Sequence, residues 1–121
     1  MVSKVKDLQV YNRAYQAALE IHQISLSLPQ IEQFALASQI RRASKGICAN
    51  LAEGFAKSSK SSAEFKRFAL MAAGSAQEME VWIDFCQDLN YLNKQKASEL
   101  VNEYAEISKM LNGLIKNWKD N

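Results

Sequence analysis

The fold is decided by one stretch of the sequence, Arg41-Arg42-Ala43-Ser44-Lys45-Gly46-Ile47-Cys48-Ala49-Asn50-Leu51-Ala52-Glu53-Gly54-Phe55. Residues three and four apart share one face of a helix, and this spacing produces two adjacent rows. An apolar row contains Ile40, Ala43, Ile47, Leu51 and Gly54, and a polar row contains Arg42, Gly46, Asn50 and Glu53. Because an unpaired buried charge is costly, we expect the rest of the chain to supply partners for the polar row.

The composition predicts one folded all-α domain over residues 1–121. The chain is 48% hydrophobic and 23% charged, which is typical of a globular protein. Four glycines and one proline provide few turns, and this disfavours a sheet with many hairpins. The net charge of +2 is too small for a strongly basic nucleic-acid binder, although it leaves room for a local basic patch.

The cysteines and the N-terminal sequence predict a cytoplasmic protein without metal or cofactor. Cys48 and Cys86 fall among small or apolar residues and are expected to be buried free thiols, which fits a reducing compartment. Together with the single histidine, His22, they do not form a recognisable zinc site. No apolar run reaches the roughly 18 residues of a membrane span, and no hydrophobic signal region follows the N-terminus.

Apolar periodicity predicts four helices joined by short connections. The first runs over about residues 6–28 and is stopped by Pro29, and the second follows Phe34 and ends near Lys57. The third follows the serine-rich loop 58–62, where Ser61 and Glu64 have capping-box spacing. The fourth is marked by apolar residues from Ala97 to Trp118. Such a chain is expected to form an antiparallel up-down-up-down four-helix bundle.

The third predicted helix is apolar on more than one side. One row steps by three and four through Phe65, Phe68, Ala72, Ser75, Met79, Trp82, Cys86 and Leu89. Further apolar side chains widen this arc: Leu70, Met71, Ala73, Val81, Ile83 and Phe85. A helix with so wide an apolar arc is central in its fold or contacts another chain.

Charge is segregated along the chain despite the small total. Residues 41–67 contain seven basic and two acidic residues, net +5, whereas residues 77–106 contain seven acidic and two basic residues, net −5. One interpretation is charge pairing between neighbouring helices or subunits. The other is a basic region that contacts nucleic-acid phosphate, with the candidate residues Lys45, Lys57, Lys60, Lys66 and Arg67.

Five motifs in a fixed order resemble a known family. They are Gln39-Ile40-Arg41-Arg42-Ala43, Asn50-Leu51-Ala52-Glu53-Gly54-Phe55, Glu64-Phe65-Lys66-Arg67-Phe68, Ala73-Gly74-Ser75-Ala76-Gln77-Glu78-Met79-Glu80 and Leu89-Asn90-Tyr91-Leu92. This series resembles the bacterial four-helix-bundle proteins called 23S rRNA intervening-sequence proteins. The resemblance implies a homopentamer without catalytic activity. It also implies a distant similarity to the accessory protein of diversity-generating retroelements, a basic pentameric bundle that binds nucleic acid.

Six polar residues on the second and third helices are candidates for one structural network. They are Arg41, Arg42, Asn50, Glu53, Ser75 and Glu78. In antiparallel neighbours, Arg41 or Arg42 could bridge to Glu53 or Glu78, because a planar guanidinium binds a carboxylate through two hydrogen bonds. The alternative is a phosphate or ligand pocket built on the same arginines.

No pattern in the sequence indicates a reaction. The single histidine excludes the paired Glu-x-x-His motifs of di-iron bundles, and there is no glycine-rich phosphate loop or nucleophile elbow. We therefore predict a non-enzymatic protein. Three hypotheses remain, in this order. The first is an oligomeric bundle that binds structured RNA or DNA through the region around the second and third helices, and the second is a protein-interaction scaffold that does not bind nucleic acid. The third is an enzyme or metal carrier, which should show bound metal or ligand on purification.

Overall fold

The computed structural model describes residues 2–118, so Met1 and residues 119–121 of the predicted domain lie outside the description. The order of elements is a 3₁₀ helix Val5–Asp7, α1 Gln9–Leu26, a 3₁₀ helix Gln30–Glu32, α2 Leu36–Lys57, α3 Ser62–Asp88 and α4 Lys94–Asn117. No strand occurs between residues 2 and 118, and the all-α prediction is confirmed.

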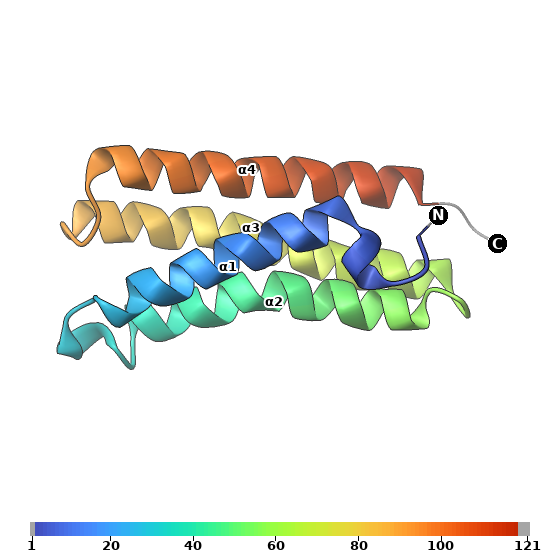
Figure 1. Ribbon diagram of the computed structural model, residues 1–121, viewed down its shortest axis with the longest axis horizontal. Coiled ribbons are helices and arrows are strands. Elements are labelled where there is room, and N and C mark those ends of the chain that lie inside the picture. Colours follow the sequence, from blue (N-terminus) through green and yellow to red (C-terminus); the bar gives the residue numbers. More distant parts are fainter. Residues whose placement is uncertain (1, 119–121) are drawn as a thin grey trace.

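Successive helices run in opposite directions and lie side by side (Figure 1). Each packs on its neighbours in sequence, and α1 also contacts α4, so the bundle closes on itself. The α1–α2 connection and the α3–α4 turn lie at one end, and the α2–α3 turn lies at the other (Figure 1). The predicted up-down-up-down arrangement is therefore what the chain adopts.

Helix ends follow local capping chemistry. The Ser61 hydroxyl accepts a hydrogen bond from the Glu64 amide at 3.2 Å and caps α3, and the Asn93 side chain accepts from the Lys96 amide at 2.7 Å and caps α4. Beyond α3, Asn90 adopts a φ of 67°, which asparagine tolerates well. The first helix is shorter than predicted at both ends. An extended residue, Leu8, separates the 3₁₀ helix from α1, and α1 ends at Leu26, before Pro29.

Helices α2 and α3 approach each other tightly at Gly54, near the turn that joins them. A Cβ atom on Gly54 would lie 2.8 Å from Phe68 Cβ and 3.2 Å from the Phe65 carbonyl oxygen, so only glycine fits there without a shift. The Phe65 ring stacks on Trp118 with ring centroids 3.8 Å apart. Gly46 has more room, since its Cβ would meet the Ser75 hydroxyl at 3.5 Å.

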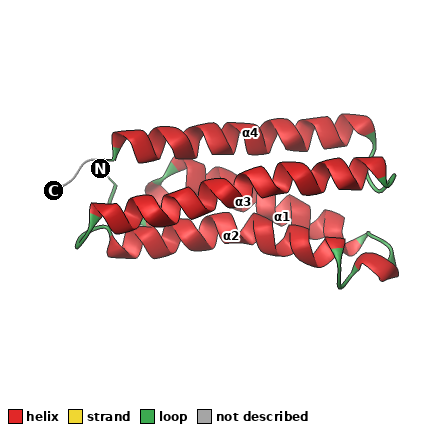
Figure 2. Cartoon of the chain, turned by 180° about the vertical axis from the view of Figure 1, so that it is seen from behind, coloured by secondary structure: helices red, strands yellow, loops and turns green. Residues whose placement is uncertain are grey.

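The apolar arc of α3 divides into two faces. The inner face is buried against α2 and α4 and consists of Phe65, Ala69, Ala72, Ala73, Ala76, Met79, Ile83 and Cys86. The outer face consists of Leu70, Met71, Val81, Phe85 and Leu89, each between 47% and 62% exposed. Figure 2 views the bundle from the side on which α3 lies in front of α1. The chain itself thus covers only part of the predicted arc.

The contact between α1 and α4 is the sparsest in the bundle. An open groove of about 620 Å³ runs along it, and ion pairs cross it. The Arg13 guanidinium donates to both carboxylate oxygens of Glu103 at 2.7 and 3.0 Å, and Lys96 pairs with Glu20. These two pairs join α1 to α4, so the basic segment 41–67 takes no part in them.

Candidate nucleic-acid interface

The predicted arginine bridge between α2 and α3 does not form within the described chain. Arg41 instead turns toward the α1–α2 connection. Its guanidinium donates to the Ser25 hydroxyl at 3.0 Å, to the Gln33 side-chain oxygen at 3.2 Å and to the Gln33 carbonyl at 2.8 Å. Arg41 therefore fixes the end of α1 to the start of α2, and neither Glu53 nor Glu78 is its partner.

The other members of the predicted network are satisfied locally or face solvent. Glu53 pairs with Lys57, at 3.8 Å, and Glu78 accepts a hydrogen bond from the Trp82 indole at 2.8 Å. Both partners lie one turn away on the same helix, where they are always within reach. Arg42 is exposed and Asn50 is half-buried. Neither side chain has a hydrogen-bond partner within residues 2–118. The half-buried Ser75 lies opposite Gly46.

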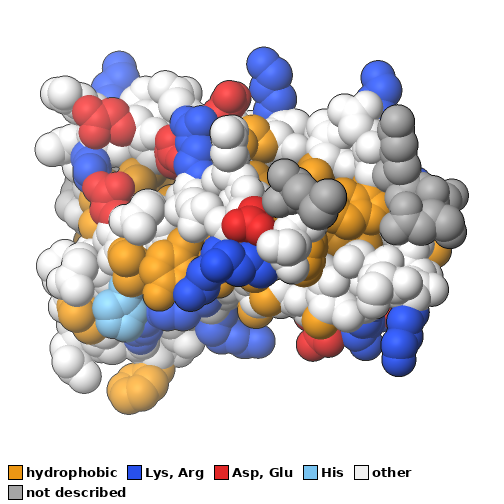
Figure 3. All heavy atoms as spheres, turned by 45° about the vertical axis from the view of Figure 1, so that its right-hand side comes forward, with side chains coloured by type: hydrophobic (Ala, Val, Ile, Leu, Met, Phe, Trp, Pro, Cys, Tyr) orange, Lys and Arg blue, Asp and Glu red, His pale blue; other side chains and the backbone are white. Residues whose placement is uncertain are grey.

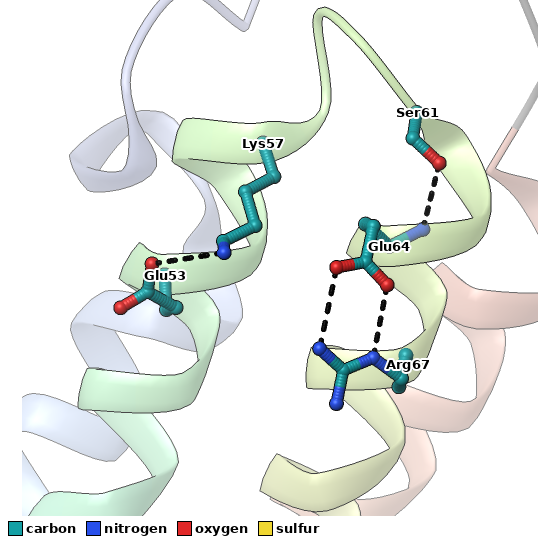
Figure 4. A network of polar contacts seen from close by, with 5 residues as sticks. All are labelled: Glu53, Lys57, Ser61, Glu64 and Arg67. Carbon is teal, nitrogen blue, oxygen red and sulfur yellow. Dashed lines mark hydrogen bonds and ion pairs between the residues drawn. The ribbon is translucent and has the colours of Figure 1, made fainter.

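Four of the five predicted basic residues gather at the α2–α3 turn. We call Lys57, Lys60, Lys66 and Arg67 the basic corner. In Figure 4 the helical ends carry two ion pairs, Glu53 with Lys57 and Glu64 with Arg67, beside the capping serine. Lys60 is exposed and Lys66 half-buried, and neither has a partner among the described residues.

The Glu64 carboxylate, which a capping box would bond to the Ser61 amide, instead bonds to Arg67. Glu64 accepts from the Arg67 guanidinium at 2.9 and 3.2 Å, and this hydrogen bonding lowers the pKa of the Glu64 carboxyl. The Ser61 amide bonds to the Lys57 carbonyl at 3.0 Å instead of to Glu64. Only the first half of the predicted capping box is therefore formed.

Two of these cations lie near one aromatic ring. The Arg67 guanidinium carbon is 4.5 Å from the centroid of the Phe68 ring, and Lys57 Nζ is 5.4 Å from it. Cations held over a ring face are attracted by its quadrupole. The corner has four basic groups against the carboxylates of Glu53 and Glu64, so it keeps an excess of positive charge.

Lys45 lies apart from the basic corner. It sits twelve residues before Lys57 on α2, or ~18 Å along the helix axis, and its ammonium contacts His22 Nδ1 at 3.0 Å. His22 is half-buried, and this contact satisfies its ring nitrogen. Residues 2–118 contain no group of three or more histidine, cysteine or acidic side chains that could hold a metal ion.

Two sets of side-chain contacts were not predicted from the sequence. The anchoring of Arg41 by Ser25 and Gln33 joins residues on either side of Pro29, and only the geometry of the connection brings them together. The Lys45–His22 contact joins α1 to α2 across 23 residues. Its one signal was a histidine on an otherwise apolar helical row.

These features define the class of the protein: a small antiparallel four-helix bundle with one basic corner and an uncovered apolar face on its longest helix. The chain belongs to the 23S rRNA-intervening sequence protein family, which matches residues 6–113. The resemblance seen in the sequence motifs is thereby confirmed. No helix in the described part of the chain is long and apolar enough to cross a membrane.

A solved structure of similar fold supports this assignment. It is the crystal structure of a protein of unknown function from the S23 ribosomal protein family of Bacteroides thetaiotaomicron. The two chains share 26% sequence identity with a TM-score of 0.80, over 89% of this chain and 96% of the other. No curated protein matches the sequence significantly.

Proposed function

We propose that this protein is a non-enzymatic, self-associating bundle of the cytoplasm that binds structured RNA or DNA through the basic corner. One observation carries the proposal: Lys60 and Lys66 have no carboxylate partner among the described residues, although both belong to the same basic corner as Lys57 and Arg67. Free lysine ammonium groups are suited to phosphate, and counterion release makes each such contact favourable at low salt. The buried free thiols of Cys48 and Cys86 support a reducing compartment.

Self-association would multiply the weak binding of a single corner. One chain offers only a few cations, and linking several copies raises overall affinity without any new type of contact. The outer face of α3 is the surface that supports assembly, because its five large apolar side chains remain about half exposed in the single chain. The resemblance stated above implies a pentamer.

The nucleic-acid proposal is tested by salt-dependent binding of a structured RNA hairpin. We expect the affinity to fall steeply with salt, and Lys60→Glu combined with Lys66→Glu to weaken binding at least tenfold and reduce the salt slope by about 2. The matched control is Lys94→Glu with Lys109→Glu, which makes the same charge change on α4. Equal effects of the two double variants would rule out the corner as the site.

Assembly is tested by measuring the mass of the protein in solution. We expect an oligomer, and we expect Leu70→Glu or Val81→Glu to dissociate it while leaving the helical content intact, because a charge on the outer face opposes its burial. A monomeric wild-type protein would refute the assembly proposal directly.

The second candidate function is a scaffold that recruits another protein through the outer face of α3. The same exposed apolar side chains favour it. Among them, Leu70 has the largest exposed fraction, 62%. A wild-type monomer that binds the RNA hairpin no better than the Lys60→Glu/Lys66→Glu variant would favour the scaffold over the nucleic-acid function.

A further inference from the structure

A pocket of about 390 Å³ lies between α1 and α2, away from the basic corner and the outer face of α3. Its lining consists of Tyr15, Ala18, Leu19, His22, Lys45 and Cys48. Figure 3 shows this side of the molecule, where the single histidine lies among hydrophobic and basic side chains. A concave site of this size, mostly apolar with a few convergent polar groups, is typical of small-ligand pockets.

The apolar part of the pocket has a buried base and exposed walls. Ala18 and Cys48 are 7% and 9% exposed, whereas Tyr15 and Leu19 are 47% and 50% exposed. The small Ala18 side chain leaves the space open between the two helices. Tyr15 and Leu19, one turn apart on α1, therefore offer apolar surface to a ligand that reaches the base.

The polar part of the pocket has a defined arrangement of hydrogen-bond donors. Lys45 Nζ lies 3.0 Å from His22 Nδ1, and an ammonium group can only donate. The imidazole therefore accepts through Nδ1 and carries its proton on Nε2. Lys45 is exposed and has no carboxylate partner among the described residues, so its remaining N–H groups and the imidazole N–H can both donate to a ligand.

We propose that this pocket binds a small amphipathic anion, with a carboxylate or sulfonate held by Lys45 and His22 and an apolar body packed on Tyr15 and Leu19. The apolar lining excludes a purely polar anion as the preferred ligand. The Lys45 ammonium group, which has no carboxylate partner among the described residues, favours a negative head over a neutral one. The site is separate from the proposed nucleic-acid function, because Lys45 is ~18 Å along α2 from the basic corner.

Two fluorescent probes with the same apolar body test this proposal. They are 8-anilinonaphthalene-1-sulfonate and its uncharged analogue N-phenyl-1-naphthylamine. We expect one sulfonate probe bound per chain, and we expect Lys45→Met to weaken its binding about three- to tenfold, since a partly exposed charge contributes modestly. Binding of the uncharged probe should be unchanged in this variant. Lys60→Met is the matched control, because it removes an equal charge at the basic corner.

The location of the bound probe needs a readout of its own, because the outer face of α3 also offers apolar surface. We expect the sulfonate probe to slow the alkylation of Cys48, measured by mass, and to leave the more deeply buried Cys86 unaffected. Ala18→Met should fill the pocket, so that the sulfonate probe no longer binds there and no longer slows the alkylation of Cys48. The variant protein should still melt cooperatively. Equal binding by Lys45→Met and Lys60→Met, or unchanged alkylation of Cys48, would overturn the proposal.

Discussion

Both faces of α3 carry large apolar side chains, but the two faces differ in burial. On the inner face, Phe65, Met79 and Cys86 are at most 1% exposed, because α2 and α4 pack against them. On the outer face, Leu70 and Phe85 remain at least half exposed. Periodicity identifies both faces as apolar, whereas only the positions of the neighbouring helices decide which one the chain covers itself.

This difference separates folding from assembly. Residues of the inner face are buried as soon as one chain folds, so their packing contributes to the stability of the monomer. Residues of the outer face gain burial only when another molecule covers them. Substitutions on the two faces should therefore affect different measurements.

The largest expected difference comes from one residue type placed on both faces. Met79 is completely buried and Met71 is 47% exposed. Met79→Ala should lower the free energy of unfolding by about 3 kcal/mol, because it leaves a cavity in the core. Met71→Ala should change it by less than about 0.5 kcal/mol. Chemical denaturation under conditions where the protein is monomeric measures both, and similar losses for the two variants would break the distinction.

A smaller effect is expected from the two glycines of α2 that face α3. Gly54→Ala should lower the free energy of unfolding by about 2 kcal/mol, because the added Cβ would lie 2.8 Å from Phe68 Cβ and neither backbone can easily move. Gly46→Ala should raise it by up to about 1 kcal/mol, since alanine favours the helix and the nearest atom is 3.5 Å away. Thermal melting shows whether each variant is more or less stable than the wild type. Stabilisation by Gly54→Ala would contradict the close approach of α2 and α3 at this residue.

The smallest expected effect concerns the thiol of the inner face at alkaline pH. Burial, with a contribution from the Glu32 carboxylate, raises the pKa of the Cys86 thiol from 9.0 to about 11. The unfolded chain then loses this proton first, so the stability from the neutral thiol is complete below pH 9 and is lost as the pH rises toward 11. Between pH 8 and 10 the free energy of unfolding should therefore fall by about 1 kcal/mol through this thiol.

The matched comparison is the same pH interval in the Cys86→Ala variant. Its free energy of unfolding should fall less between pH 8 and 10 than that of the wild type, by about 1 kcal/mol. Cys48 provides a second test, because burial also raises the pKa of its thiol to about 11. Identical pH dependence in wild type and Cys86→Ala would show that the thiol does not titrate in this way.

The sequence predicted most of the fold because helical periodicity is a local property. The end of α2, the start of α3 and the cap at Ser61 agree with the structure, since each depends on residues a few positions apart. The start of the first helix was wrong, because the break at Leu8 separates a 3₁₀ turn from α1 without a proline or glycine to mark it.

Polar partners were harder to predict than helices. Long side chains such as Arg41 can reach several neighbours, and the connection after α1 placed Ser25 and Gln33 nearer than Glu53. Glu53 and Glu64 were taken by basic residues on their own helices, where the spacing guarantees proximity. Four of the five predicted basic residues did come together, because they flank one short turn, whereas Lys45 is too far along α2 to join them.

The thin contact between α1 and α4 makes the first helix the part of the bundle most able to detach. It is crossed by Arg13–Glu103 and Lys96–Glu20, whose side chains are between 31% and 43% exposed and whose attraction is screened by dissolved ions. Backbone amides of α1 should therefore exchange with deuterium sooner than those of α3, and more so in concentrated salt. Such breathing would expose the core along a single edge while the other three helices stay together.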